Sequence, residues 1–242
     1  MNRHMYTSLE HDRFWYNSAL GQALMEEECA QLHEILPTLF GLHSLQLGTR
    51  FAPEHFSASS IKHHINMSVT NSHNENASLY SYAEAMPFAT ESVDLVVLPH
   101  VLEFSENPHA ILREVDRCLI GDGHLLIFAF NPWSYWQPWR GLKRLGGGYP
   151  WRGHYYSSGR LHDWLALLGF EVSEKRNFFF RPPLNHPGIL NKTTWLDTLA
   201  SRYLPFLSAG YMILARKRTE LVTPIRQPLR RSNLFGVGLS PP

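Results

Sequence analysis

The sequence lacks the features that assign a chain to a class at once. It has only two cysteines, Cys29 and Cys118, and they do not have the spacing of a metal site. The N-terminus has no basic segment followed by an apolar run, and no apolar stretch approaches the roughly 18 residues that a membrane span needs. We therefore expect a soluble protein of the reduced cytoplasm, without a transmembrane segment.

An excess of charge of one sign is also missing. Lys and Arg number 22 against 21 Asp and Glu, a net charge of +1, which gives no overall field to collect nucleic acid or anionic membrane. Any basic partner surface has to be local. The 14 histidines, His63 and His64 included, lack metal-ligand spacing, so we expect no metal site.

The composition that is present suits one globular core. In 242 residues, 44% are hydrophobic and 13% aromatic, which is enough for a single α/β domain. We expect this domain to span residues 1–218, with a leading helix at 18–36 and an aromatic insertion at 133–156. Residues 219–242 are rich in Pro, Gly and Arg, and we expect a basic, disordered tail there, with RNA contact as the alternative to a solvated end.

The middle of the chain has the pattern of a βαβ unit. Residues 93–98 are a continuous apolar run, typical of a strand buried on both faces of a parallel sheet. A helix over 108–119 follows, with Asn107 as its cap and Pro108 at its first position, and residues 124–130 form the next strand. Further strands are expected at 42–47, near 61–69, at 170–174 and at 211–218, and a helix at 157–168.

Ligands in such a sheet bind at the carboxyl ends of the strands, where the strand order reverses. The segments just after the expected strands are therefore the candidates for a site. They are Gly48 with Thr49, the stretch Tyr82–Phe88, the pair Pro99–His100, and Asn131.

Four segments resemble the class I S-adenosylmethionine-dependent methyltransferases, specifically methyltransferase type 11 and its YafS-like branch. They read AEAMPFATESVDLVVLPHVLEF, NPHAILREVDRCLIGDGHLLIFAFNP, RLHDWLALLGFEV and YMILARKR. The resemblance implies a doubly wound, mostly parallel α/β sheet of the Rossmann-like type with an antiparallel last strand. It also implies S-adenosyl-L-methionine as cofactor and methyl transfer to an acceptor that the sequence does not identify.

The resemblance also suggests roles for individual residues. His100 is the candidate general base, and Asn131, Trp133 and Trp136 are candidates for contact with the acceptor. The candidates for binding the cofactor are Gly48, Thr49, Tyr82, Ala83, Glu84, Met86, Pro99 and His100.

Several family features are missing. Arg50 and Ala52 stand where the family has the second and third glycines of its first loop, and no acid follows the second strand to bind the ribose. Tyr82 replaces the acid that meets adenine, and His63, His64 or Asn66 could reach the ribose instead. The stretch between the first and third strands is short, so we expect a helix to be trimmed or lost. These departures support a second hypothesis, a methyltransferase-shaped binding or scaffold protein without activity.

Two features leave alternatives open. The aromatic insertion can pack in the core, cover a substrate pocket, or contact a partner or lipid. We expect the acceptor to be a small or lipid-like molecule rather than nucleic acid, and the sequence does not indicate an oligomeric state. His100 and Glu103 are three residues apart, which favours packing or a hydrogen bond over a metal site without a third ligand.

Overall fold

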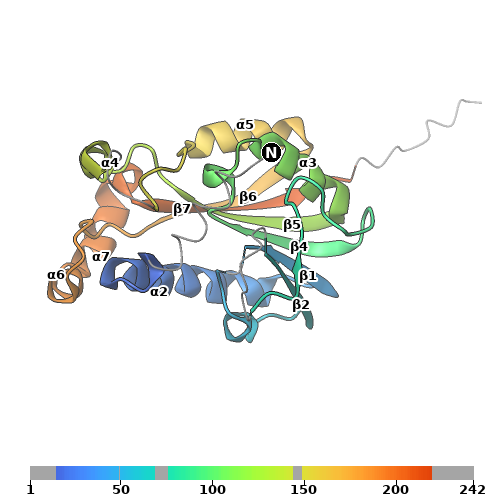
Figure 1. Cartoon of the computed structure of the whole chain (residues 1–242), viewed down its shortest axis with the longest axis horizontal. Coiled ribbons are helices and arrows are strands. Elements are labelled where there is room, and N and C mark those ends of the chain that lie inside the picture. The colour runs from blue at the N-terminus through green and yellow to red at the C-terminus, as the bar shows by residue number, and fades with distance from the viewer. Residues whose placement is uncertain (1–14, 49, 69–75, 144–148, 220–242) are drawn as a thin grey trace, which may run out of the picture.

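The structure is a computed structural model that describes residues 15–48, 50–68, 76–143 and 149–219. Thr49 and the expected tail beyond residue 219 lie outside these residues. A seven-stranded sheet stands between two layers of helices (Figure 1). Its order is β3-β2-β1-β4-β5-β7-β6. The strands are β1 (His43–Leu47), β2 (His63–Ser68), β3 (Leu79–Tyr80), β4 (Val93–Pro99), β5 (Leu119–Phe130), β6 (Phe170–Phe178) and β7 (Gly210–Lys217).

The direction of the strands matches the expected fold class. Strands β1 to β5 run parallel to one another. Strand β7 runs antiparallel to both β5 and β6. The expected doubly wound sheet with an antiparallel last strand is therefore confirmed.

Two groups of helices cover the two faces of this sheet. The helices α3 (Pro108–Cys118) and α5 (Ser158–Leu167) pack on the face that carries Val96, Leu98 and Ile127. The helix α2 (Ala19–Ile35) packs on the face that carries Val97 and Phe128. Adjacent residues of β4 thus face opposite layers, and the apolar run of this strand is buried on both sides.

Side-chain caps are present at the starts of α2 and α3, and the cap at Asn107 was predicted. Ser18 Oγ accepts a hydrogen bond from the Gly21 N–H (3.2 Å) and begins α2. Asn107 Oδ1 accepts one from the Ala110 N–H (3.1 Å), with Pro108 at the first position of α3. Each cap satisfies a backbone donor that has no partner within the helix.

The structure differs from the sequence expectation in several regions. Strand β5 begins at Leu119 rather than at residue 124, because Leu119 pairs with Val93 and the ladder then bulges before Leu95 pairs with His124. Three helices were not expected: α4 (Gln137–Lys143), α6 (Pro187–Lys192) and α7 (Trp195–Tyr203). The short helices α4 and α6 contain both Pro and Gly, which weaken the helical signal in their sequences.

The connection from β1 to β2 is short, as expected. It contains one 3₁₀ turn, η2 (Pro53–Phe56), instead of an α-helix. Further 3₁₀ turns are η1 (Leu36–Thr38), η3 (Leu102–Phe104) and η4 (Pro205–Leu207). In the part of the chain that the structure describes, no helix is both long enough and apolar enough to cross a membrane.

Candidate functional site

The candidate site lies at the carboxyl ends of β1 and β4. The chain proceeds from β1 to β2 and β3 on one side of the sheet and from β4 to β5 on the other, so the strand order reverses between β1 and β4. Gly48 follows β1 and His100 follows β4. These residues therefore flank the crevice where ligands of such sheets bind.

Gly48 has a backbone conformation and surroundings that let a ligand come close to its main chain. Its φ is +77°, a conformation that side chains rarely adopt, and its N–H donates to the Met67 carbonyl (2.8 Å). Among the described residues, a β-carbon built here would meet only the Val101 side chain, at 3.9 Å. The space in front of Gly48 is thus open, and a ligand could approach its backbone. Thr49, the next candidate, lies outside the described residues.

The segment after β3 is held against α3. The Met86 N–H donates to Glu114 Oε2 (3.1 Å), and its carbonyl accepts from Arg117 (3.0 Å). Ala83 and Met86 are buried, whereas the Tyr82 side chain is 64% exposed. Glu84 is half-buried and Pro99 is buried. The exposed ring of Tyr82 therefore stands at the same edge as Gly48, on a fixed backbone.

The residues considered for the ribose lie at two different places along β2. His63 contacts His43 (2.8 Å) and His64 contacts Ser44 Oγ (2.5 Å), both at the start of β1 and β2. These two histidines lie at the amino edge, opposite Gly48, so they are not placed to reach a ribose there, which the sequence had left open as a possibility. Asn66 is closer to the carboxyl end, and its buried Oδ1 has no hydrogen-bond partner among the described residues.

His100 stands between two carboxylates in the interior. Its Nε2 contacts Glu28 Oε1 (2.8 Å), and its Nδ1 contacts Glu103 Oε1 (3.0 Å). Glu103 Oε1 also accepts from the Phe130 N–H (2.8 Å). The backbone of His100 has a φ of +54°, which is costly for a residue with a side chain. This turn aims the ring from the end of β4 toward α2.

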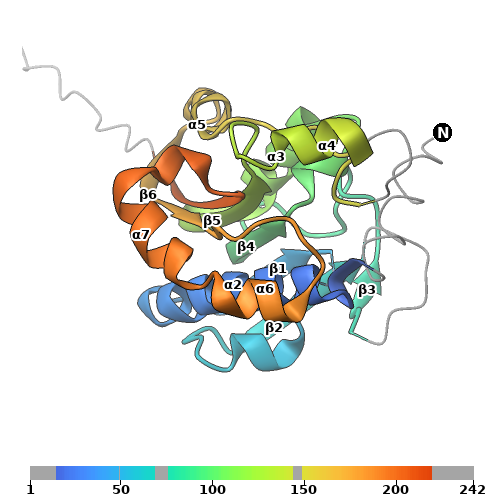
Figure 2. The same ribbon diagram turned by 90° about the vertical axis from the view of Figure 1, so that its left-hand side faces the viewer.

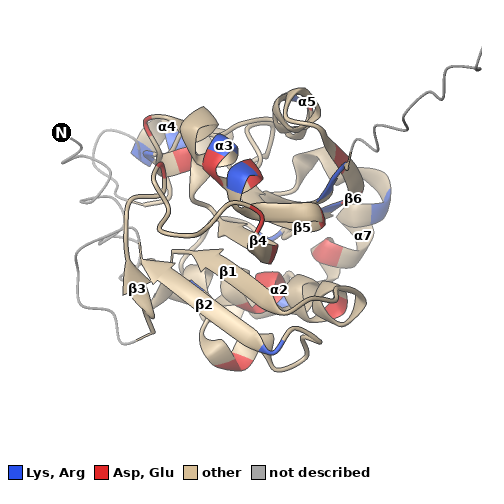
Figure 3. Ribbon diagram, turned by 90° about the vertical axis from the view of Figure 1, so that its right-hand side faces the viewer, with Lys and Arg blue, Asp and Glu red and all other residues tan. Residues whose placement is uncertain are grey.

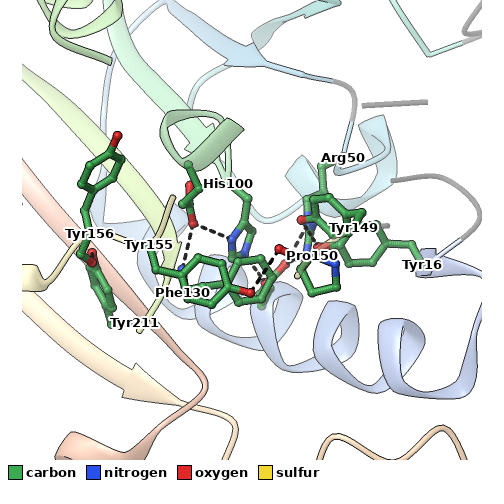
Figure 4. A network of polar contacts seen from close by, with 11 residues as sticks. Tyr16, Arg50, His100, Phe130, Tyr149, Pro150, Tyr155, Tyr156 and Tyr211 are labelled. Atoms are coloured by element: carbon green, nitrogen blue, oxygen red, sulfur yellow. Dashed lines mark hydrogen bonds and ion pairs between the residues drawn. The ribbon is translucent and has the colours of Figure 1, made fainter. Parts of the chain in front are cut away.

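Arg50 binds the second carboxylate oxygen of Glu28 and so joins a buried network with His100 and Glu103. Its Nε and Nη2 donate to Glu28 Oε2 (2.9 and 2.6 Å), and its Nη1 donates to the Tyr149 hydroxyl (3.1 Å). The guanidinium lies over the Tyr16 ring (3.4 Å), and the hydroxyls of Tyr16 and Tyr149 are 2.6 Å apart. Figure 4 shows these side chains converging from several parts of the chain.

The charges of the network balance when His100 is protonated. A ring that faces a carboxylate at each nitrogen donates at both, which requires the imidazolium form. Burial by itself lowers the pKa of His100, but Glu28 and Glu103 raise it, and the net direction is upward. Burial raises the pKa of Glu28 against the attraction of His100. The pKa values of His100 and Glu28 are thus both raised, and both shifts favour a proton between His100 Nε2 and Glu28 Oε1.

This arrangement limits the chemistry that His100 offers. The side chain is 1% exposed, and both ring nitrogens are engaged with carboxylates. A ring in this state has no free nitrogen to accept a proton. The hydrogen bond between His100 and Glu103 is the kind of contact that their spacing favours. No group of three or more His, Cys, Asp or Glu in the described ranges is placed to hold a metal ion.

The candidates for acceptor contact have different surroundings. Trp133 is 72% exposed, whereas Trp136 is 1% exposed and its Nε1 donates to the Arg181 carbonyl (3.0 Å). Asn131 is buried, and its Nδ2 donates to the carbonyls of Phe206 (2.7 Å) and Ser208 (3.0 Å). Of the three, only Trp133 presents its side chain to the solvent.

Glu28 and the partners of Arg50 were missed by the sequence reasoning. Glu28 lies 72 positions from His100, so no local spacing connects them. One signal was available. Leu20, Leu24, Glu28 and Leu32 follow at intervals of four, which places an acid within the buried stripe of the leading helix. An acid in such a stripe requires a buried partner.

Comparison with known proteins links the chain to one family. The family described as "Methyltransferase domain" matches residues 50–127. The protein YafS of Escherichia coli (strain K12) is 32% identical over 201 residues, which cover 81% of this chain and 78% of YafS.

Two solved structures share the fold at low sequence identity. A SAM-dependent methyltransferase of Thermotoga maritima has a TM-score of 0.63 at 18% identity, and the match covers 89% of this chain and all of that one. A structure of the Haloferax volcanii Trm112 methyltransferase activator with its partner has a TM-score of 0.54 at 15% identity, covering 78% of this chain and 88% of that one.

The first prediction concerns the stability of the network. Glu28→Gln removes the carboxylate shared by Arg50 and His100 and leaves their charges buried without it, so we expect a loss of about 3–5 kcal/mol in the free energy of unfolding. Urea denaturation measures this loss. The matched control is Glu26→Gln on the exposed face of α2, with an expected change within about 0.5 kcal/mol. Equal effects of the two substitutions would contradict the role given to Glu28.

The second prediction concerns pH. Below the usual pKa of an unfolded histidine, about 6.5, His100 is charged in both states and its stabilisation is complete. Above that value the unfolded chain releases the proton and the folded chain keeps it, so the free energy of unfolding falls as pH rises through the raised pKa of His100. Urea denaturation from about pH 6 to about pH 9 should show a shallower fall in His100→Asn. Parallel curves for the two proteins would refute the assignment.

Proposed function

The chain belongs to the methyltransferase family that includes YafS, and we propose that it transfers a methyl group from S-adenosyl-L-methionine to an acceptor. The observation that carries the proposal is the open space in front of Gly48. This glycine has a positive φ at the point where the strand order reverses, and only Val101 lies near the position of a β-carbon. The site therefore retains the backbone approach that the cofactor needs.

The residues at this edge fit an adenosyl cofactor. Gly48 and Thr49 would face its methionine part, and the exposed Tyr82 offers a ring for stacking on adenine. The buried, unpartnered Oδ1 of Asn66 can accept a hydrogen bond from a ribose hydroxyl. The remaining cofactor contacts of the proposal are Ala83, Glu84, Met86, Pro99 and His100.

The protein's share of such a reaction is alignment. The sulfonium of the bound cofactor makes its methyl carbon electrophilic, so the residues of the chain have to position the acceptor and exclude water. We assign His100 a positioning role, because its two ion-pair contacts fix the turn after β4. Trp133 can meet the acceptor directly, while Asn131 and Trp136 support the segment that carries it.

A specific observation favours the alternative of a scaffold without cofactor. Arg50 replaces a glycine of the family's first loop, and its guanidinium turns inward to Glu28. The helix that normally follows this loop is reduced to η2. A protein with these changes could keep the fold and lose the ligand.

The proposed setting of the reaction is the cytoplasm. Cys29 and Cys118 are free and buried, as suits a reducing compartment. We propose a small or lipid-like acceptor rather than nucleic acid.

The third prediction tests cofactor binding by calorimetric titration with S-adenosylmethionine and S-adenosylhomocysteine. We expect a dissociation constant between about 1 µM and about 1 mM, because the ribose carboxylate and its charge-assisted hydrogen bonds are missing. Gly48→Asp should weaken binding by about tenfold or more, through bulk and repulsion of the ligand's carboxylate.

The matched control is Gly169→Asp. Gly169 has nearly the same φ, +80° against +77°, has nothing within 4 Å of a β-carbon, and precedes β6 at the opposite edge of the sheet. Both substitutions carry the same backbone strain, but only Gly48→Asp should change affinity. Absence of heat at millimolar ligand would favour the scaffold, and equal affinities for the two variants would remove Gly48 from the site.

A further inference from the structure

Exposed apolar side chains are concentrated at one end of the molecule. The described ranges contain 14 large hydrophobic residues that are exposed. Nine of them, without Leu167 of α5, lie between residues 133 and 206 in the segments that follow β5 and β6. Six of them form what we call the apolar surface: Trp133, Trp195, Leu199, Tyr203, Leu204 and Phe206. Figures 1 and 2 show α4, α6 and α7 together at this end.

The helix α7 carries the centre of the apolar surface. Trp195, Leu199 and Tyr203 are spaced by four residues and fall within about 80° of the helix circumference. Their side chains are 58%, 52% and 66% exposed, and α7 has no buried residue. This stripe is therefore turned away from the core, the reverse of an ordinary surface helix.

Polar contacts hold α7 in this orientation. Asp197 lies about 160° from the centre of the stripe. It pairs with Arg181 (2.6 Å) and accepts from the Phe180 N–H (2.6 Å). Asn131 joins the remaining parts, because it accepts from the Trp133 N–H (3.0 Å) and donates to the Phe206 carbonyl (2.7 Å). The outward stripe is thus a fixed feature of the fold.

The same segments are basic in a chain that is nearly neutral. Residues 131–162 contain five Lys or Arg and no Asp or Glu, and residues 179–209 contain three Lys or Arg and one Asp. That one acid, Asp197, is paired with Arg181, while Lys143, Lys192 and Arg202 are exposed. Figure 3, which faces the opposite end of the molecule, shows Asp and Glu on α2 and α3.

We propose that the apolar surface docks on an anionic lipid bilayer. Trp and Tyr are the residues that prefer the headgroup region, and a rigid apolar stripe flanked by Lys and Arg is the chemistry of peripheral binding. Negative lipid headgroups complement the exposed Lys143, Lys192 and Arg202. A second copy of the chain does not, because two such surfaces would bring like charges together. The proposal is independent of cofactor binding.

Sedimentation with vesicles tests the docking of the full chain. We expect binding to vesicles of phosphatidylcholine mixed with phosphatidylglycerol, and at most about one tenth of that binding to vesicles of phosphatidylcholine alone. The variant Trp195→Ala, Leu199→Ala, Tyr203→Ala should bind at least about tenfold more weakly. Its control is Phe40→Ala, Leu42→Ala, Leu167→Ala, which removes residues that are 74%, 73% and 85% exposed. Ala is a strong helix former, so the substitutions in α5 and α7 do not disfavour these helices. Circular dichroism checks the folds of both variants.

A second pair of variants tests the charge. Lys143→Glu, Lys192→Glu, Arg202→Glu should abolish binding to the anionic vesicles, because each cation near such a surface is worth about fivefold. The control Lys62→Glu, Arg113→Glu, also on exposed residues, should leave at least half of the binding. Failure to bind anionic vesicles, or equal binding of all variants, would overturn the proposal. So would a dimer in light scattering that the apolar variant dissociates, which would assign the surface to a second copy.

All vesicle measurements omit S-adenosylmethionine. A chain that fails to bind the cofactor can therefore still show docking, and a chain that binds the cofactor can still fail to dock. The proposals of cofactor binding and of bilayer docking are therefore tested by separate results.

Discussion

The buried contact between Glu28, Arg50 and His100 is the constraint on which the carboxyl edge depends. Burial of an ionised group costs several kcal/mol unless partners replace its water. Here α2 supplies Glu28, the segment after β1 supplies Arg50, and the turn after β4 supplies His100. Each charge is compensated only when all three elements are in place, so the network fixes α2 against the strand ends. The positive φ of His100 shows that the turn gives up a relaxed backbone for these contacts.

The same contact explains how the first loop can differ from its family. Glycines in that loop normally let a ligand approach, and a helix normally follows. In this chain Arg50 is held between Glu28 and the ring of Tyr16, and a single 3₁₀ turn leads on to β2. The ion pair therefore does the positioning that a helix would otherwise do. Only Gly48, which precedes Arg50, keeps the open backbone on which the proposed cofactor site rests.

The sequence predicts those parts of the fold whose signals are local. Continuous apolar runs identified β4 and most of β5, and Asn107 with Pro108 marked the start of α3. The orientation of β7 came from the resemblance, since no pattern in a strand reveals the direction of its neighbours. The helix α7 was missed although Trp195, Leu199 and Tyr203 have helical spacing, because its nine residues offer only this one short stripe.

The site was harder to predict than the fold, because its contacts join distant positions. The spacing of His100 and Glu103 indicated their hydrogen bond, but nothing near His100 points to Glu28. His63 and His64 were considered as possible replacements for the missing ribose acid. The register places them at the amino edge, beside the first residues of β1. In a parallel sheet the first residues of every strand lie at the amino edge, away from the crevice at the carboxyl ends.

The topology places the crevice and the apolar surface at one edge of the sheet. Phe130 ends β5, Phe178 ends β6, and both pair across from Gly210 at the start of β7. The segments that follow β5 and β6 must therefore leave from the carboxyl edge, where Gly48 and His100 also lie. Asn131 then ties the beginning of one segment to the end of the other. A molecule that docks on the apolar surface therefore meets the same edge as a ligand in the crevice, which fits the lipid-like acceptor that we propose.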